Sequence, residues 1–173
     1  ESKLLAFANP KIKPKNDSSS LRGLADNVVL NKGIERFNIS NIHSSLGYND
    51  WPKLLYAEKE ALNIKEIEPS TKIFTGIDAS EEKLFELSKT GELKKYNIIH
   101  FATHAISIPE VQNASSIILS SGKNEDFDGY LTPSEISKLD LNADLVNLSA
   151  CQTALGKIYD SEGIIGFAQS FIE

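Results

Sequence analysis

Two near-continuous apolar stretches decide the fold: YNIIHFAT at residues 96–103 and ADLVNLSA at residues 143–150. Runs of this kind, without polar alternation, are typical of strands in a parallel sheet that is covered on both faces. A third short run, LLAFA at residues 4–8, is stopped by Asn9-Pro10 and is predicted to be a further buried strand. The sequence therefore indicates a sheet with a layer of helices on each side.

Segments with helical spacing separate the apolar strands. Apolar residues between 51 and 65 favour an amphipathic helix with Asp50 as its N-cap and Pro52 in its first turn. Residues 72–75 are predicted to form a short strand, after which Ser80 opens another helix. This order predicts an α/β three-layer sandwich with a mostly parallel sheet, and we expect the sheet to be incomplete at the C-terminus of this chain.

The rest of the chain contributes loops and shorter elements. Residues 9–50 lack sustained periodicity and are predicted to be a long loop or insertion. A strand is expected at 116–119 and a turn at 126–129. Thr132-Pro133-Ser134-Glu135 has the pattern of a capping box with proline at the first helical position, and 162–171 has the spacing of a final helix.

Composition excludes several classes of protein. A chain of 173 residues with 40% hydrophobic residues is sufficient for one globular domain, so residues 1–173 are expected to form one domain. The net charge of −6 and the lack of a dense Lys/Arg cluster argue against nucleic-acid binding. No apolar run approaches the roughly 20 residues that span a bilayer, and no signal peptide is evident, so we expect a cytoplasmic protein that does not bind membranes.

The single cysteine, Cys151, can form no internal disulfide, and it has no zinc-ligand partner at a typical spacing. No metal or other cofactor is therefore expected. By position, however, Cys151 and His104 each come soon after one of the two long apolar strands. Because loops that leave the carboxyl ends of parallel strands converge, we predict that these two side chains meet at one edge of the sheet.

The motifs around these residues resemble a known family. The blocks are IIHFATHA at 98–105, GYLTPSEI at 129–136, LVNLSACQTALGK at 145–157 and EGIIGFAQSFI at 162–172. They are similar to the signature blocks of CHAT domains, which are bacterial caspase-like and separase-like domains often fused behind tetratricopeptide repeats. His104 precedes Cys151 by 47 residues, close to the spacing of about 50 in caspases. The resemblance implies the caspase-hemoglobinase fold.

The resemblance also implies the roles of individual residues. Cys151 would attack the scissile carbonyl as a thiolate, and His104 would protonate the leaving amine. The backbone N–H groups of Cys151 and Ala105 would stabilise the oxyanion. The family usually has glycine where this chain has Ala105, and an alanine would be strained there if the loop required a positive φ.

Other polar residues near the dyad allow two interpretations. Ser149, Asp160 and Glu162 are candidates for substrate binding, and the two acidic residues would then select a basic substrate side chain. Equally, acidic residues at this position complement the dipole of the following helix. His100, within the apolar strand, is predicted to be a hydrogen-bonded core histidine, and His43 has no assignable role.

The function implied by the resemblance is that of a cysteine endopeptidase acting on a protein or peptide substrate. A sensor region, such as tetratricopeptide repeats in the same polypeptide, would control it. The alternative is a catalytically inactive caspase-like binding module, which the alanine at position 105 and the expected incompleteness of the sheet at the C-terminus suggest. A nucleotide-binding α/β domain is a third reading, but neither G-x-G-x-x-G nor G-x-x-x-x-G-K-[ST] occurs in the sequence.

Overall fold

The computed structural model describes residues 3–12, 51–106, 115–124, 126–149 and 171. Its centre is a sheet of four parallel strands in the order β2-β1-β3-β7. The strands span Leu4–Pro10 (β1), Lys72–Gly76 (β2), Ile98–Ala102 (β3) and Leu145–Leu148 (β7). The parallel sheet predicted from the apolar runs is therefore confirmed.

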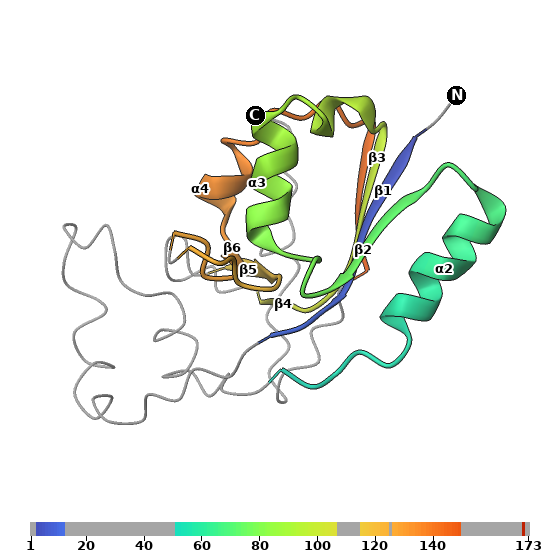
Figure 1. Ribbon diagram of the computed structural model, residues 1–173, viewed down its shortest axis with the longest axis horizontal. Coiled ribbons are helices and arrows are strands. Elements are labelled where there is room, and N and C mark those ends of the chain that lie inside the picture. The colour runs from blue at the N-terminus through green and yellow to red at the C-terminus, as the bar shows by residue number, and fades with distance from the viewer. Residues whose placement is uncertain (1–2, 13–50, 107–114, 125, 150–170, 172–173) are drawn as a thin grey trace.

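Helices cover both faces of this sheet (Figure 1). Helix α2 lies on one side, and α3 and α4 lie on the other. Their bounds are Ala57–Ile67 (α2), Glu81–Lys89 (α3) and Pro133–Ile136 (α4), and a short 3₁₀ turn, η1, spans Leu93–Lys95. This arrangement confirms the α/β fold with flanking helices and is consistent with a caspase-like fold.

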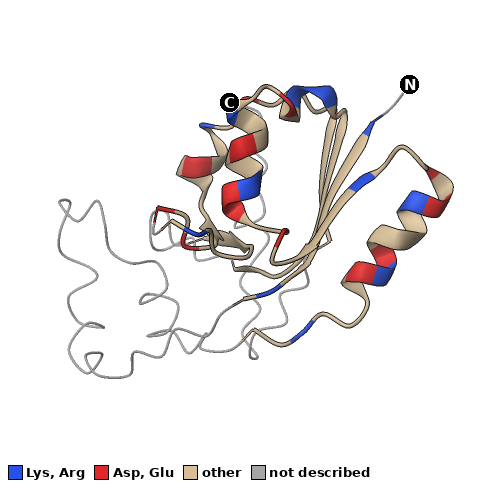
Figure 2. Cartoon of the chain, viewed as in Figure 1, with Lys and Arg blue, Asp and Glu red and all other residues tan. Residues whose placement is uncertain are grey.

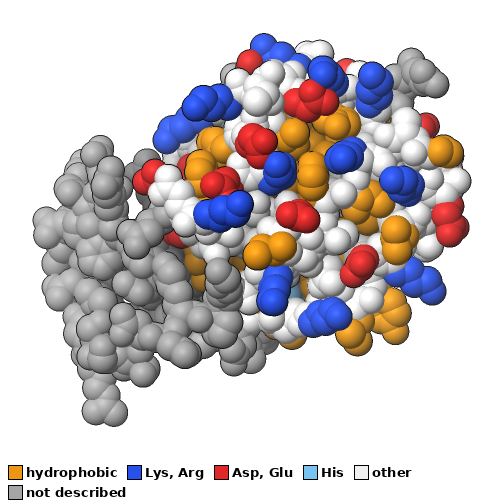
Figure 3. Space-filling model, in the orientation of Figure 1, with side chains coloured by type: hydrophobic (Ala, Val, Ile, Leu, Met, Phe, Trp, Pro, Cys, Tyr) orange, Lys and Arg blue, Asp and Glu red, His pale blue; other side chains and the backbone are white. Residues whose placement is uncertain are grey.

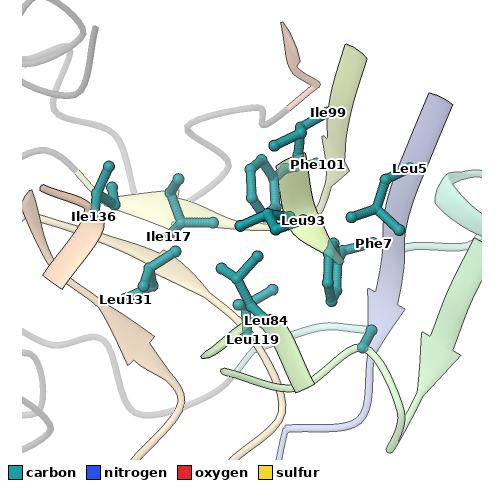
Figure 4. Packing of buried hydrophobic residues seen from close by; sticks show 11 residues of the cluster. Leu5, Phe7, Leu84, Leu93, Ile99, Phe101, Ile117, Leu119, Leu131 and Ile136 are labelled. Atoms are coloured by element: carbon teal, nitrogen blue, oxygen red, sulfur yellow. The ribbon is translucent and has the colours of Figure 1, made fainter. Parts of the chain in front are cut away.

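The face toward α3 holds the main hydrophobic core (Figure 4). In the register of β1 and β3, Leu5 lies opposite Ile99 and Phe7 opposite Phe101. The rings of Phe7 and Phe101 stack with centroids 5.7 Å apart. Leu84 of α3 is fully buried in the same cluster. Burying a side chain of this size contributes about 1.5 to 3 kcal/mol, so this face supplies much of the driving force for folding.

The face toward α2 is lined by small side chains. Its buried cluster consists only of alanines, which come from β1, β3 and α2: Ala6, Ala8, Ala57, Ala61 and Ala102. Alanine side chains let the helix backbone come close to the sheet. Polar side chains on the inner side of α2 are thereby brought within reach of the strands beneath.

A second, antiparallel sheet adjoins the α3 side, with strand order β4-β5-β6. Its strands are Ala105–Ile106 (β4), Ser116–Ile118 (β5) and Tyr130–Leu131 (β6). The strand expected at 116–119 is thus present and ends one residue earlier. At the turn before β6, Gly129 has φ +92°, and a Cβ there would lie 2.7 Å from the carbonyl oxygen of Leu119. Only glycine fits this turn without displacing backbone.

Two of the predicted helix starts are confirmed. Ser80 caps α3, and its hydroxyl accepts a hydrogen bond from the backbone N–H of Lys83. Thr132 and Glu135 form the capping box at the start of α4, with Pro133 in the first turn.

The predicted start of the helix at residue 51 is wrong. Helix α2 begins at Ala57, with Tyr56 as an N-cap whose side chain makes no capping hydrogen bond. Pro52 therefore lies outside the helix, in an irregular segment that leads into it. The carbonyl group of Pro52 is consequently available to another partner.

Several predictions fall on parts of the chain that the structure does not describe. Most of the long loop or insertion assigned to residues 9–50 lies there, as does nearly all of the helix predicted at 162–171. Cys151, Asp160 and Glu162 also lie outside the described residues.

The outer surfaces of the helices carry charges of both signs. Figure 2 shows that both acidic and basic residues occur along α2 and α3. On the face in Figure 3, charged side chains of both signs are interspersed with hydrophobic ones. Such mixing is typical of solvent-facing helices. Among the described helices, none has the length and apolar character needed to cross a membrane.

One acidic side chain is buried instead of exposed. Glu81, the first residue of α3, is 1% exposed. Its Oε2 accepts a hydrogen bond from the backbone N–H of Gly129 at 2.8 Å. Burial raises the pKa of Glu81 to about 8; this hydrogen bond lowers it, and the nearby carboxylates of Glu135 and Asp128 raise it further. The carboxyl group is thus largely protonated at neutral pH.

This burial predicts a specific dependence of stability on pH. The folded protein keeps a proton on Glu81 up to about pH 8, whereas the unfolded chain releases it near the ordinary glutamate pKa of 4.5. The free energy of unfolding should therefore fall as pH rises from about 5 to 8. Glu81→Gln keeps an acceptor for Gly129 and removes the titration. We expect the variant to be more stable than wild type at pH 8 by about 1 kcal/mol or more, measured by urea unfolding.

The matched control is Glu86→Gln on the same helix, where the carboxylate is 56% exposed and paired with Lys83. This variant should keep the wild-type slope of stability against pH. An unchanged slope in Glu81→Gln would show that Glu81 does not titrate in this window.

Candidate active site

His104 lies just beyond the carboxyl end of β3, where the chain turns into β4. Two hydrogen bonds fix this connection between β3 and β4. The hydroxyl of Thr103 donates to the carbonyl oxygen of Ile118, and the N–H of Ile118 donates to the carbonyl oxygen of His104 at 2.8 Å. Thr103 and His104 are both buried, at 1% and 3% exposed. The backbone around His104 is therefore fixed by the second sheet.

The imidazole ring of His104 is oriented by a backbone carbonyl. Its Nε2 lies 2.7 Å from the carbonyl oxygen of Pro52. Because a carbonyl oxygen can only accept a hydrogen bond, Nε2 must carry the proton, and in the neutral ring Nδ1 is then the basic nitrogen. No described residue makes a hydrogen bond to Nδ1. Nδ1 is thus the nitrogen that can exchange a proton with a nucleophile.

An aromatic side chain supports the same ring. The centroids of the Trp51 and His104 rings are 5.3 Å apart, with the planes tilted by 44°. Trp51 is in turn hydrogen bonded to Tyr130 of β6. Burial raises the pKa of Tyr130, the hydrogen bond with Trp51 lowers it, and Asp128 raises it, so the phenol stays protonated at neutral pH. Trp51 therefore links His104 to the second sheet.

Ala105 occupies the position after His104 without backbone strain. It is the first residue of β4, and Asn9 is the only non-glycine residue with a positive φ among those described. A side chain at this position therefore meets no conformational penalty. Hydrogen-bonded pairs alternate along an antiparallel ladder. Because the pair of His104 and Ile118 is hydrogen bonded, the N–H of Ala105 should point away from β5.

The end of β7 lies beside the end of β3. Phe101 pairs with Leu148, and the N–H of Ser149 donates to the carbonyl oxygen of Phe101 at 2.8 Å. Both strands run in the same direction, so the chain leaves β7 at the edge of the sheet where His104 lies. Cys151 follows Ser149 by two residues in the sequence. Ser149 is thus the last described residue before the predicted nucleophile.

His100 is a buried, hydrogen-bonded histidine of β3, as the sequence predicts. It is 2% exposed, and its Nδ1 lies 2.8 Å from the side-chain amide of Asn147 on β7. Its Nε2 lies 3.2 Å from Oε1 of Glu60 on α2, a contact at ion-pair distance that does not meet the angular geometry of a hydrogen bond. Burial lowers the pKa of His100, while Glu60 raises it; burial dominates, so the ring is held neutral.

A pocket of about 370 Å³ adjoins His104. Apolar residues of β1 and of the segment before α2, including Pro10, Trp51 and Leu54, contribute to its lining. Lys11 and Lys53 also line it. The pocket thus combines apolar surface with cationic side chains next to the imidazole.

Sequence reasoning located His104 but missed the groups that orient it. Pro52 and Trp51 were assigned to a helix, whereas both contact His104 from an irregular segment. Glu60 was not identified as part of the site, and its hydrogen bond with Ser149 joins residues 89 positions apart. A Trp-Pro pair directly after a long aperiodic stretch is the one local signal that pointed to a turn instead of a helix start.

Comparison with known proteins gives one match. The family model of the CHAT domain matches residues 2–173. No curated protein and no solved structure matches the chain.

The geometry of Ala105 predicts the effect of restoring glycine. Since the alanine has an ordinary φ, Ala105→Gly should only add backbone freedom to the unfolded chain and lower stability by about 0.5 to 1 kcal/mol. Gly91→Ala is the reciprocal control. Gly91 has φ +72° with open space around it, so an alanine there should lower stability through backbone strain alone. Thermal unfolding measures both, and a stabilising Ala105→Gly would contradict the extended conformation.

Proposed function

The chain belongs to the CHAT domain family, a family of caspase-like cysteine peptidases, and from this premise we propose that it is a cysteine endopeptidase with Cys151 as nucleophile. His104 acts as the general base and acid. The observation that carries the proposal is the orientation of His104: its Nε2 is engaged by the carbonyl of Pro52, which leaves Nδ1 as the proton acceptor.

The first chemical step is activation of the thiol. A free cysteine has a pKa near 8.5, so only a few per cent is thiolate at neutral pH. Transfer of the thiol proton to Nδ1 of His104 gives a thiolate and an imidazolium, and the carbonyl of Pro52 stabilises the imidazolium through its hydrogen bond with Nε2. The thiolate attacks the scissile carbonyl, and Nδ1 returns the proton to the leaving amine.

The oxyanion that forms in this attack requires preorganised donors. We assign this role to the backbone N–H groups of Cys151 and Ala105. The alternation of the β4–β5 ladder supports the assignment of Ala105, because it directs this N–H away from β5. Ala105 has no positive φ, so backbone strain at this residue gives no argument for an inactive binding module.

The substrate is a protein or peptide segment that lies along the edge of the sheet. The pocket lined by Trp51, Leu54 and Pro10 adjoins His104 and suits a substrate side chain near the scissile bond. Ser149, Asp160 and Glu162 are further candidates for substrate contacts. Control by a sensor region, such as tetratricopeptide repeats in the same polypeptide, and a cytoplasmic location complete the proposal.

Labelling and cleavage assays on three variants test the mechanism. A peptidyl electrophile should alkylate wild type but not Cys151→Ala, and His104→Ala should slow the alkylation. Cleavage of a peptide panel by the full-length protein should fall by about 10³-fold or more in either variant, because the two residues act as one unit. His43→Ala replaces a histidine without an assigned role and should leave both rates unchanged.

The outcomes separate the two functions. An inactive binding module would show no electrophile labelling above that of an exposed thiol and no loss on replacing His104. Proteolysis retained in Cys151→Ala would eliminate the mechanism.

A further inference from the structure

A polar network lies within the alanine layer between α2 and the sheet. Glu60 occupies the inner side of α2 because it is three residues after Ala57 and one before Ala61, both of which are buried against the strands. His100 of β3 is almost fully buried there. The side chain of Glu60 is 41% exposed, so of this pair only His100 is buried. A buried histidine needs partners, because burying polar groups costs free energy unless they are partnered.

The carboxylate of Glu60 connects three elements. Its Oε1 faces Nε2 of His100 at 3.2 Å, and its Oε2 accepts a hydrogen bond from the hydroxyl of Ser149 at 3.1 Å. Asn147, opposite His100 in the register of β3 and β7, contacts the other ring nitrogen at 2.8 Å. Helix α2, strand β3 and the end of β7 are thereby joined through one side chain.

The network determines the tautomer of His100. When the amide nitrogen of Asn147 donates to Nδ1, that nitrogen must be unprotonated, so the ring proton lies on Nε2. Nε2–H then faces the carboxylate of Glu60. His100 thus presents an N–H group to one oxygen of Glu60 at ion-pair distance, while the other oxygen accepts the hydrogen bond from Ser149.

We propose that Glu60, which lies at ion-pair distance from His100, is a positioning residue for the nucleophile. Its hydrogen bond with Ser149 fixes the residue that directly follows the end of β7, two residues before Cys151. The inference rests on the proposed function for the role of Cys151. It assigns to Ser149 a part in holding the chain, since its hydroxyl is bonded to Glu60.

The same segment of chain then serves both members of the dyad. Pro52, five residues before α2 begins, holds Nε2 of His104, and Glu60, in the first turn of α2, holds Ser149. A shift of this segment away from the sheet would loosen His104 and the approach to Cys151 together. Loss of alignment by about 1 Å can reduce the rate of a reaction by about 100-fold.

The test compares variants that lack or retain a hydroxyl at position 149. Ser149→Ala removes the hydrogen bond with Glu60, and Ser149→Thr retains a hydroxyl. In the full-length protein, we measure the rate of alkylation of Cys151 by iodoacetamide as a function of pH, and kcat and KM for peptide cleavage. Ser149→Ala should lower kcat by about 10- to 100-fold with little change in KM, and Ser149→Thr should restore most of it.

The pH profile of alkylation gives a readout that a merely structural role would not change. With the dyad aligned, the thiolate forms at a pH well below that of a free thiol, whose pKa is about 8.5. In Ser149→Ala and Glu60→Ala the profile should move toward that of a free thiol. The control is Glu58→Ala, also on α2, whose carboxylate contacts only Asn9 among the described residues, at 3.4 Å. Its profile should match wild type.

The outcomes distinguish failure of the positioning role from failure of the peptidase mechanism. If the wild-type profile is low and depends on His104, but Ser149→Ala and Glu60→Ala leave the profile and kcat unchanged, the positioning role is overturned and the peptidase remains. If wild type behaves as a free thiol regardless of His104, both proposals are overturned. Glu60→Ala also leaves His100 buried without its partner and lowers stability, so Ser149→Ala against Ser149→Thr is the decisive pair.

Discussion

The structure depends on the complete enclosure of β3. This strand pairs with β1 on one edge and β7 on the other, and both of its faces are covered by helices. The strand is paired along both edges and four of its five residues are buried, so its carboxyl end has little freedom to move. The backbone of a residue placed just after such a strand therefore starts from a fixed position. His104 is that residue.

The two faces of the sheet do different physical work. Leucine and phenylalanine side chains on the α3 side provide most of the buried apolar surface. The alanines on the α2 side provide little, but they allow a close approach. That approach brings Glu60 to His100 and Ser149, and it brings the segment with Pro52 to His104. Stability and the geometry of the site are thus supplied largely by opposite faces.

Much of the fold and the position of His104 could be predicted from the sequence. Long apolar runs indicate buried parallel strands, and reactive residues in such sheets follow the carboxyl ends of the strands. The start of α2 was misplaced because Trp51 and Pro52 are held by contacts with His104, a tertiary effect that overrides local spacing. Strands β4 and β6 are two residues each, too short to show a period. Glu60 was missed because its partners are distant in sequence. The conformation of Ala105 could not be predicted because it depends on strand pairing that no local sequence pattern encodes.

The alanine layer also sets the order in which the molecule opens. Helix α2 buries little apolar surface against the sheet and begins without a side-chain cap, whereas α3 is capped by Ser80 and anchored by Leu84. Regions with few buried apolar contacts have the lowest free energy of local unfolding. Amide hydrogens of α2 should therefore exchange with solvent before those of α3 and β3. Each such opening releases Glu60 from Ser149 while β3 stays folded, so a state with an intact sheet and without this hydrogen bond should be visited far more often than the unfolded state.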